Sequence, residues 1–190
     1  MSEWSAIGDW IPTLAQLRIA VFREFPYLYD GSAEYEQKYL QTYVNSATSI
    51  AVLAIVNGEV IGASTGLALA DEDPTFIQSF SDSGYNVGDI FYCAESVLLP
   101  DYRGMGVYKY FFNGREAHAR SLPAIKTLAF CAVQRPLNHP LRPANYVPLD
   151  DIWRRFGYCR RPELATTFHW KDIDEVESSA KAMVFYTKQL

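Results

Sequence analysis

The sequence predicts a single α/β domain. Its 190 residues are 49% hydrophobic and 21% charged, which supplies one packed core but is too short for two independent domains. Two local patterns predict the kind of fold: an Asn57-Gly58 pair between two β-rich apolar runs, and a glycine-containing turn between a strand and an amphipathic helix. No linker, low-complexity tract or repeat divides the chain, so we expect one domain over residues 1–190.

The first half of the chain predicts two helices and a hairpin. Residues 12–24 carry a broad apolar stripe behind Pro12, a residue that suits the first turn of a helix. Residues 33–44 form the second helix, and core packing is the commoner explanation for three tyrosines that share one side of it, Tyr35, Tyr39 and Tyr43. Strands at 50–56 and 60–69 flank the turn pair and form the hairpin.

The second half predicts a polar stretch and then a strand, a helix and a strand that imply a parallel pair. In chain order we expect a polar segment at 71–88, a strand at 91–99, a helix at 104–121, a strand at 125–133, a proline-rich loop at 134–148, a short helix at 149–156, and final strands at 164–170 and 181–188.

Composition excludes several classes of function. The net charge of -5 has no compensating basic cluster, so we expect no nucleic-acid partner. No apolar run approaches the roughly 18 residues of a membrane span, and the N-terminus carries Glu3 and Asp9 without a basic region, so the sequence predicts a cytoplasmic protein with no membrane contact. Three widely spaced cysteines with no histidine at ligand spacing predict free thiols and no metal site.

One segment carries the spacing of an anion site: Arg103-Gly104-Met105-Gly106-Val107-Tyr108. A helix N-terminus leaves backbone amides unpaired and carries a partial positive charge, so a glycine turn that leads into a helix suits a pyrophosphate. Glycine removes the side chain that would keep an oxyanion from the main chain. The helix that follows should dock on the sheet through Val107, Tyr110, Phe111, Gly114 and Ala117.

This segment resembles the central signature of the GNAT superfamily of N-acetyltransferases, Arg/Gln-x-x-Gly-x-Gly/Ala, except that Tyr108 stands where a small residue is usual. A later segment, Ile152-Trp153-Arg154-Arg155-Phe156-Gly157-Tyr158, is similar to the superfamily's Leu-Tyr-x-x-x-Gly-Phe segment. Together the two cover roughly residues 91–188. The resemblance implies an α+β domain with a mixed, mostly antiparallel sheet of about six to seven strands flanked by about four helices.

The resemblance also implies a function: an acyltransferase that moves an acetyl group from acetyl-CoA to the primary amine of a small or amino-acid-like acceptor by direct attack. The pantetheine would pair with the backbone of Ser96, Val97 and Leu98, the latter two also supplying amides to the thioester oxygen. The remaining coenzyme-binding residues would be Arg103, Gly104, Met105, Gly106, Val107, Tyr108 and Trp153. A catalytically inactive acyl-CoA-binding sensor or interaction module is the alternative, and a longer acyl donor and a homodimer remain open.

The catalytic groups are less defined. Trp153 stands where the superfamily often has a tyrosine proton donor, and an indole cannot donate its proton at neutral pH. Tyr146 and Tyr158 are the nearest phenols in sequence, or the thiolate leaves unaided or takes a proton from water. Glu95 is a candidate base within an apolar strand; a structural carboxylate paired with an arginine is an equal alternative. His139 could relay a proton, although loop solvation is the commoner explanation.

The acceptor should bind beside the aromatic residues of the first interhelical segment, as the superfamily builds its acceptor site there. We expect Phe25, Tyr27 and Tyr29 in its wall, with Phe22 beside them, and Arg135 or Arg142 as a partner for a substrate carboxylate. Core packing accounts for at least half of these rings.

Two other signals carry no function. Gly62-Ala63-Ser64-Thr65-Gly66 fits the serine-hydrolase pattern by letters, but it lies inside a predicted strand with no helix after it. Cys93 and Cys131 lie in apolar strands, where thiols are usually inert, so we do not expect a covalent mechanism.

Overall fold

The computed structural model describes residues 6–190, so Glu3 lies outside the described chain. These residues form five α-helices and one six-stranded sheet. In chain order the elements are α1 (Ala6–Phe22), α2 (Ala33–Asn45), β1 (Ile50–Val56), β2 (Glu59–Ala68), α3 (Pro74–Asp82), β3 (Ile90–Leu98), α4 (Val107–Ser121), β4 (Thr127–Val133), α5 (Asp150–Arg155), β5 (Cys159–Trp170) and β6 (Ser179–Gln189). None of the helices in this part of the chain has the length and apolar character of a membrane span.

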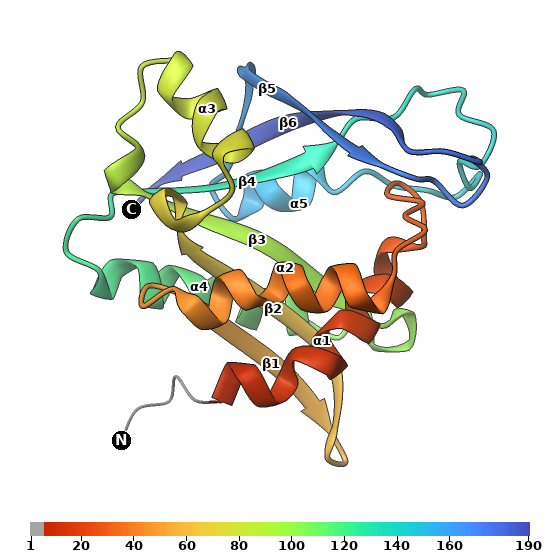
Figure 1. The fold of residues 1–190 in the computed structure, drawn as a ribbon, viewed down its shortest axis with the longest axis horizontal. Helices are drawn as coiled ribbons and strands as arrows, with labels where there is room; N and C mark the ends of the chain where they lie inside the picture. The colour runs from red at the N-terminus through yellow and green to blue at the C-terminus, as the bar shows by residue number, and fades with distance from the viewer. Residues whose placement is uncertain (1–5) are drawn as a thin grey trace.

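The sheet has the strand order β1-β2-β3-β4-β6-β5, and only the β3–β4 pair is parallel. The predicted hairpin, the parallel pair and the mixed, mostly antiparallel sheet are therefore confirmed. The parallel pairing covers only Ile90–Tyr92 against Thr127–Ala129, although β3 continues to Leu98 and β4 to Val133. Beyond this short contact the two strands diverge, as Figure 1 shows, and the centre of the sheet opens.

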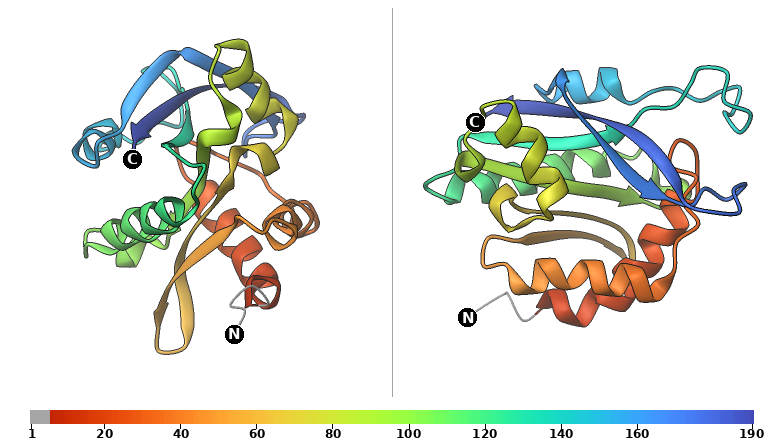
Figure 2. Two further views of the ribbon diagram at one scale, coloured as in Figure 1. Left: turned by 90° about the vertical axis from the view of Figure 1, so that its left-hand side faces the viewer. Right: turned by 45° about the horizontal axis from the view of Figure 1, so that its top comes forward.

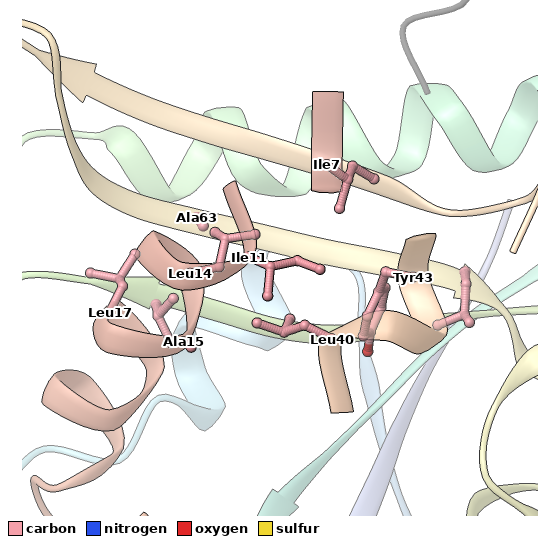
Figure 3. Packing of buried hydrophobic residues seen from close by; sticks show 10 residues of the cluster. Ile7, Ile11, Leu14, Ala15, Leu17, Leu40, Tyr43 and Ala63 are labelled. Carbon is pink, nitrogen blue, oxygen red and sulfur yellow. The ribbon is translucent and has the colours of Figure 1, made fainter. Parts of the chain in front are cut away.

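Helices cover both faces of the sheet: α1, α2 and α3 lie on one side, and α4 and α5 on the other (Figure 2). On the first side, apolar residues of α1 and α2, among them Ile11, Leu14, Leu40 and Tyr43, pack over the sheet at Ala63 of β2 (Figure 3). On the second side, a cluster that includes Phe91, Phe112, Phe130, Tyr158 and Tyr186 joins α4 and α5 to β3, β4 and β6. Each face of the sheet therefore packs against its own layer of helices.

The buried face of α4 differs from the predicted stripe. Tyr110 is 72% exposed and Ala117 is exposed, whereas the buried side chains are Phe111, Phe112, Arg115 and Ala119. The helix also begins at Val107 rather than at residue 104, because Gly104 and Gly106 have positive φ angles that do not fit a right-handed helix. Within this buried face, Phe111 packs against Ile61 of β2 and Leu98 of β3.

Three element boundaries also differ from the sequence prediction. Helix α3 lies within the segment at 71–88, which the sequence predicts only as polar, with no helix expected. Pro74 begins it, and the Asp73 carboxylate caps it by accepting a hydrogen bond from the Thr75 amide at 2.9 Å. Helix α1 begins at Ala6, so Pro12 lies inside it. Strand β5 begins at Cys159 because a register shift between Arg161 and Ala165 lets its first part pair with β6 as well.

Candidate functional site

Two cavities lie where β3 and β4 diverge. The larger, of about 1050 Å³, extends from the turn before α4 to the 141–156 segment. The smaller, of about 440 Å³, lies among α1, α2, α3 and β5. Five residues line both cavities, so the cavities adjoin at the opening of the sheet: Phe22, Tyr27, Ala94, Glu95 and Cys131. The larger one reaches the upper end of the ~300–1,000 Å³ range of small-molecule sites.

The glycine turn forms one end of the larger cavity. Gly104 and Gly106 have φ angles of 77° and 81°, and a Cβ built at either position meets no atom within 4 Å. Gly106 is the N-cap residue of α4, and no side chain of the described chain caps this helix by a hydrogen bond. Lys109 donates its amide to the Gly106 carbonyl at 3.1 Å, and the amides of Val107 and Tyr108, which open this fifteen-residue helix, are left to water or a ligand.

The predicted coenzyme residues divide into those that line the larger cavity and two that do not. Ser96, Leu98, Arg103, Gly104, Gly106, Val107, Tyr108 and Trp153 line it. Met105 is 69% exposed beside the turn, and the Val97 side chain is buried under α1 and α2. Arg103 fastens the turn: its Nε donates to the Leu98 carbonyl at 3.1 Å, and its Nη1 lies 2.7 Å from the Glu24 carboxylate.

The β3 edge that faces β4 has no strand neighbour after Tyr92 within residues 6–190. On its other edge, β3 stays paired with β2 as far as Leu98. The main chain of 93–98 therefore borders the larger cavity along one side, and an extended ligand can pair with it as an added strand would.

A β-bulge decides where Glu95 points. Thr65 pairs with Glu95 but Leu67 pairs with Tyr92, so β3 has one residue more than β2 in this interval. One extra residue reverses the side to which the following side chain points. Cys93 accordingly packs on the α4 side, whereas the Glu95 carboxylate reaches the guanidinium of Arg18 on α1, at 2.5 Å from Nη1.

Arg18 binds two carboxylates at once. Its Nε also donates to Glu36 of α2, and its guanidinium lies over the rings of Phe22 and Tyr39 at 5.1 and 4.6 Å. Burial alone would lower the pKa of Arg18, but the Glu95 and Glu36 carboxylates raise it well above its usual value. Glu95 is thus both an ion-paired carboxylate and a residue at the junction of the cavities.

The candidate proton donors have different surroundings. Tyr146 lines the larger cavity with its ring edge-on to Phe25, and burial raises the pKa of its phenol. Tyr158 is buried in the α4 side of the core, and its hydroxyl lies 3.8 Å from the Cys93 sulfur. The sequence alone left both phenols open; only Tyr146 is in the wall of a cavity.

Of the other predicted residues, some line the cavities and some do not. Phe25 lines the larger cavity, Tyr29 the smaller, and Tyr27 both. His139 lies outside both linings, with its ring 5.7 Å from Phe25 and its Nδ1 accepting from the Leu141 amide at 3.2 Å.

Arg135 is also outside both linings, because its guanidinium is fully engaged elsewhere. It binds the Asp172 carboxylate at 2.6 and 2.9 Å. It also donates to the carbonyls of Pro26 and Tyr27 at 2.7 and 2.6 Å. These bonds fix the segment that carries the aromatic wall.

The thiols near the site are poorly suited to nucleophilic chemistry. Burial raises the pKa of Cys131 to about 12 and also raises that of Cys93. Both groups are therefore protonated at neutral pH. Within residues 6–190 no group of three or more His, Cys, Asp or Glu side chains is arranged to hold a metal ion.

Sequence reasoning did not identify Arg18, Glu36 and Arg115. Arg18 and Arg115 are single charged residues on helix faces that are otherwise apolar. A charge in such a place indicates a buried and paired side chain, but only the apolar residues of these faces were considered. Arg115 is buried beside the larger cavity, and its Nη1 donates to the Glu95 carbonyl at 2.9 Å. Glu36 was missed because the three tyrosines of the same helix led us to interpret that helix as core packing alone.

Comparison with solved structures identifies the fold. A ribosomal-protein-alanine N-acetyltransferase from Brucella melitensis superposes with a TM-score of 0.63 at 12% identity, covering 96% of each chain. An acetyltransferase of the GNAT family from Streptococcus pneumoniae gives 0.55 at 13% identity, covering 94% of this chain and 95% of that one. An aminoglycoside 6'-acetyltransferase type Ii gives 0.54 at 12%, covering 97% and 90%. No protein-family model and no curated protein sequence matches this chain.

The chain therefore has the GNAT fold, as its two sequence segments indicated. At these identities the likeness establishes the architecture alone.

Proposed function

We propose that the protein is an acetyl-CoA-dependent N-acetyltransferase that acts on the primary amine of a small or amino-acid-like acceptor. The observation that carries this proposal is the opening between β3 and β4, which joins a cavity beside an uncapped helix N-terminus to a second, aromatic cavity. Such an arrangement lets two substrates enter from opposite sides and meet at Glu95. Structural neighbours described as acetyltransferases support the same class of reaction.

The residues of the larger cavity fit acetyl-CoA. The turn at Gly104 and Gly106 would hold the pyrophosphate, since no Cβ covers the amides that open α4. The free edge of β3 would pair with the pantetheine amides through residues 96–98. When bound, the coenzyme supplies a thioester, an acyl group activated for attack by an amine.

The acceptor amine must be unprotonated to attack. Glu95 is the carboxylate at the junction of the cavities, and we assign it the role of proton acceptor, directly or through a water molecule. Its ion pair with Arg18 fixes the carboxylate in place. The amides of Val97 and Leu98 would stabilise the developing oxyanion.

The departing thiolate needs a proton. Of the two phenols that the sequence offered as donors, Tyr146 is the one that lines the larger cavity, together with Tyr27, Tyr108 and Tyr186. Burial raises its pKa further above neutrality, so the phenol is protonated at neutral pH. We therefore assign it as the proton donor. Trp153, which occupies the position of the superfamily's tyrosine, would contribute ring contact with the coenzyme and no proton.

The test is release of free coenzyme A from acetyl-CoA in the presence of a panel of metabolite amines, followed with a thiol reagent. We expect release that depends on the amine and saturates with it. If calorimetry detects no heat for acetyl-CoA or coenzyme A with the folded protein, the proposal is wrong at its first step.

The alternative function is an acyl-CoA-binding sensor or interaction module without catalysis, suggested by Trp153 at the proton-donor position and by Tyr108. It predicts that the coenzyme binds while no amine on a broad panel stimulates thiol release. Tighter binding of a longer acyl-CoA would identify a different donor.

A further inference from the structure

The smaller cavity has walls suited to a cation. Aromatic rings enter it from several elements: Tyr29, Tyr35 and Tyr39 around α2, Phe76 of α3, and Phe168 and Trp170 of β5. Rings of this kind attract an alkylammonium group through their electron-rich faces and pack against its carbon chain. Arg18 already uses the Tyr39 ring in this way, at 4.6 Å.

The charges that face this cavity do not balance. Glu36 and Glu95 share the single guanidinium of Arg18. The other ionic residues that line this cavity, Lys171 and Asp30, pair with each other at 2.7 Å, so the lining carries one carboxylate more than it has cations. A buried carboxylate without its own cation is costly, and a cationic ligand would remove that cost.

Glu36 retains an unused acceptor. Its residue is 1% exposed, its Oε2 accepts from Arg18, and its Oε1 accepts no hydrogen bond from residues 6–190. The Tyr29 phenol lies beside this carboxylate, and burial followed by a hydrogen-bonding interaction with Glu36 raises its pKa, although Oε1 accepts no hydrogen bond of normal geometry from the described residues. Buried acceptors of this kind are uncommon and need an explanation.

Glu36 also lies away from the reaction centre. Glu95 lines both cavities, whereas Glu36 lines only the smaller one. A cation held by Glu36 is therefore not the nitrogen that attacks the thioester. Since one guanidinium binds both carboxylates, a short carbon chain is enough to connect the two nitrogen positions.

We propose that the smaller cavity binds an acceptor with a second cationic nitrogen, which Glu36 holds within the aromatic wall while the reacting amine lies at Glu95. This inference rests on the proposed acetyltransferase function and specifies its substrate class as diamines and related polycations. An acceptor whose second group is a carboxylate would be repelled by the excess negative charge of the lining and should be a poorer substrate than a diamine.

The experiment compares three acceptors of matched chain length: putrescine, n-butylamine and γ-aminobutyrate. For the wild-type protein, kcat/KM should be at least about tenfold higher for putrescine than for n-butylamine, and lowest for γ-aminobutyrate. In Glu36→Gln the ratio of kcat/KM for putrescine to that for n-butylamine should fall at least about tenfold. Glu34→Gln, an exposed carboxylate on the same helix, should keep the wild-type ratio.

The outcomes separate the two proposals. Equal use of putrescine and n-butylamine, or a preference for γ-aminobutyrate, overturns the dication inference and leaves the acetyltransferase function standing. An unchanged ratio in a folded Glu36→Gln protein that still binds acetyl-CoA also overturns the inference. If that variant does not fold, the wild-type order of the three acceptors decides. No thiol release with any amine overturns the proposed function itself.

Discussion

The Trp153 indole nitrogen lies 3.5 Å from the Tyr108 hydroxyl in the wall of the larger cavity. Both residues depart from the GNAT pattern, Tyr108 where a small residue is usual and Trp153 where a tyrosine is usual, and the fold brings them together from α4 and α5. Trp153 also packs edge-on against Phe130 and Tyr186, with ring centroids 5.0 and 4.8 Å away. These two unusual residues are therefore neighbours in the wall of the larger cavity.

This pair predicts unequal effects of substitution. Trp153→Ala should lower the free energy of unfolding by about 2 kcal/mol, because a half-buried ring loses its packing. Tyr108→Phe removes only a long hydrogen bond and should change that free energy by less than about 0.5 kcal/mol. Urea unfolding measures both. Equal losses in the two variants would contradict a role of Trp153 in packing.

The glycine turn gives a prediction about coenzyme affinity. Gly106→Asp should weaken acetyl-CoA binding by on the order of 100-fold, because it places a carboxylate at the mouth of α4 where the pyrophosphate would lie. Gly84 has a similar φ of 76° and equally open space, so Gly84→Asp imposes comparable backbone strain far from the turn.

Calorimetric titration of both variants separates strain from charge. The Gly84→Asp protein should bind acetyl-CoA as the wild type does. If Gly106→Asp retains full affinity, the coenzyme does not occupy this turn.

Much of the fold could be predicted from the sequence because turns and loops are determined by residues that are adjacent in the chain. The Asn57-Gly58 turn, the glycine turn before α4 and the proline-rich loop each depend on neighbouring residues alone. Helix α3 was missed although Asp73 and Pro74 are good helix-start residues, because the segment at 71–88 was described only by its polar character.

The site was readable only in part because its geometry depends on distant contacts. The direction of Glu95 follows from a register shift between β2 and β3, which no local pattern encodes. Its partner Arg18 is 77 residues away in sequence. The engagement of Arg135 with Asp172 likewise joins two segments that only the folded chain brings together.

Glu95→Gln tests the proton acceptor. We expect kcat at neutral pH to fall about 100-fold, because the amide cannot accept the ammonium proton, while acetyl-CoA affinity stays within about twofold. In the plot of rate against pH, the rise in rate that accompanies deprotonation of the base should disappear. If instead unfolding free energy drops and the folded variant turns over normally, Glu95 is the structural partner of Arg18 and another group removes the proton.

The buried thiols predict a pattern of chemical reactivity. Burial raises the pKa of Cys131 to about 12, so its thiolate is scarce up to alkaline pH, and burial acts on Cys93 in the same direction. Iodoacetamide at pH near 8 should therefore modify the exposed Cys159 first, as read by peptide mass spectrometry. Rapid labelling of Cys131 in the folded protein would reopen a covalent mechanism.

Asp172 anchors Arg135 and also lies 3.3 Å from Lys181, so its loss leaves the buried Arg135 guanidinium without a carboxylate, while Lys181 keeps Glu175 at 2.7 Å. Asp172→Asn should lower the free energy of unfolding by about 3–5 kcal/mol. Asp174→Asn, an exposed neighbour, should have little effect in the same urea titration.

The ion pair between Arg135 and Asp172 gives a prediction about the role of Arg135. Its bonds to Asp172, Pro26 and Tyr27 use the guanidinium to hold the aromatic segment, so Arg135→Lys should reduce stability whether or not an acceptor is present. A residue that binds a substrate carboxylate would behave differently. Unchanged stability with a higher KM only for acceptors that carry a carboxylate would show that Arg135 contacts the substrate, as the sequence first suggested.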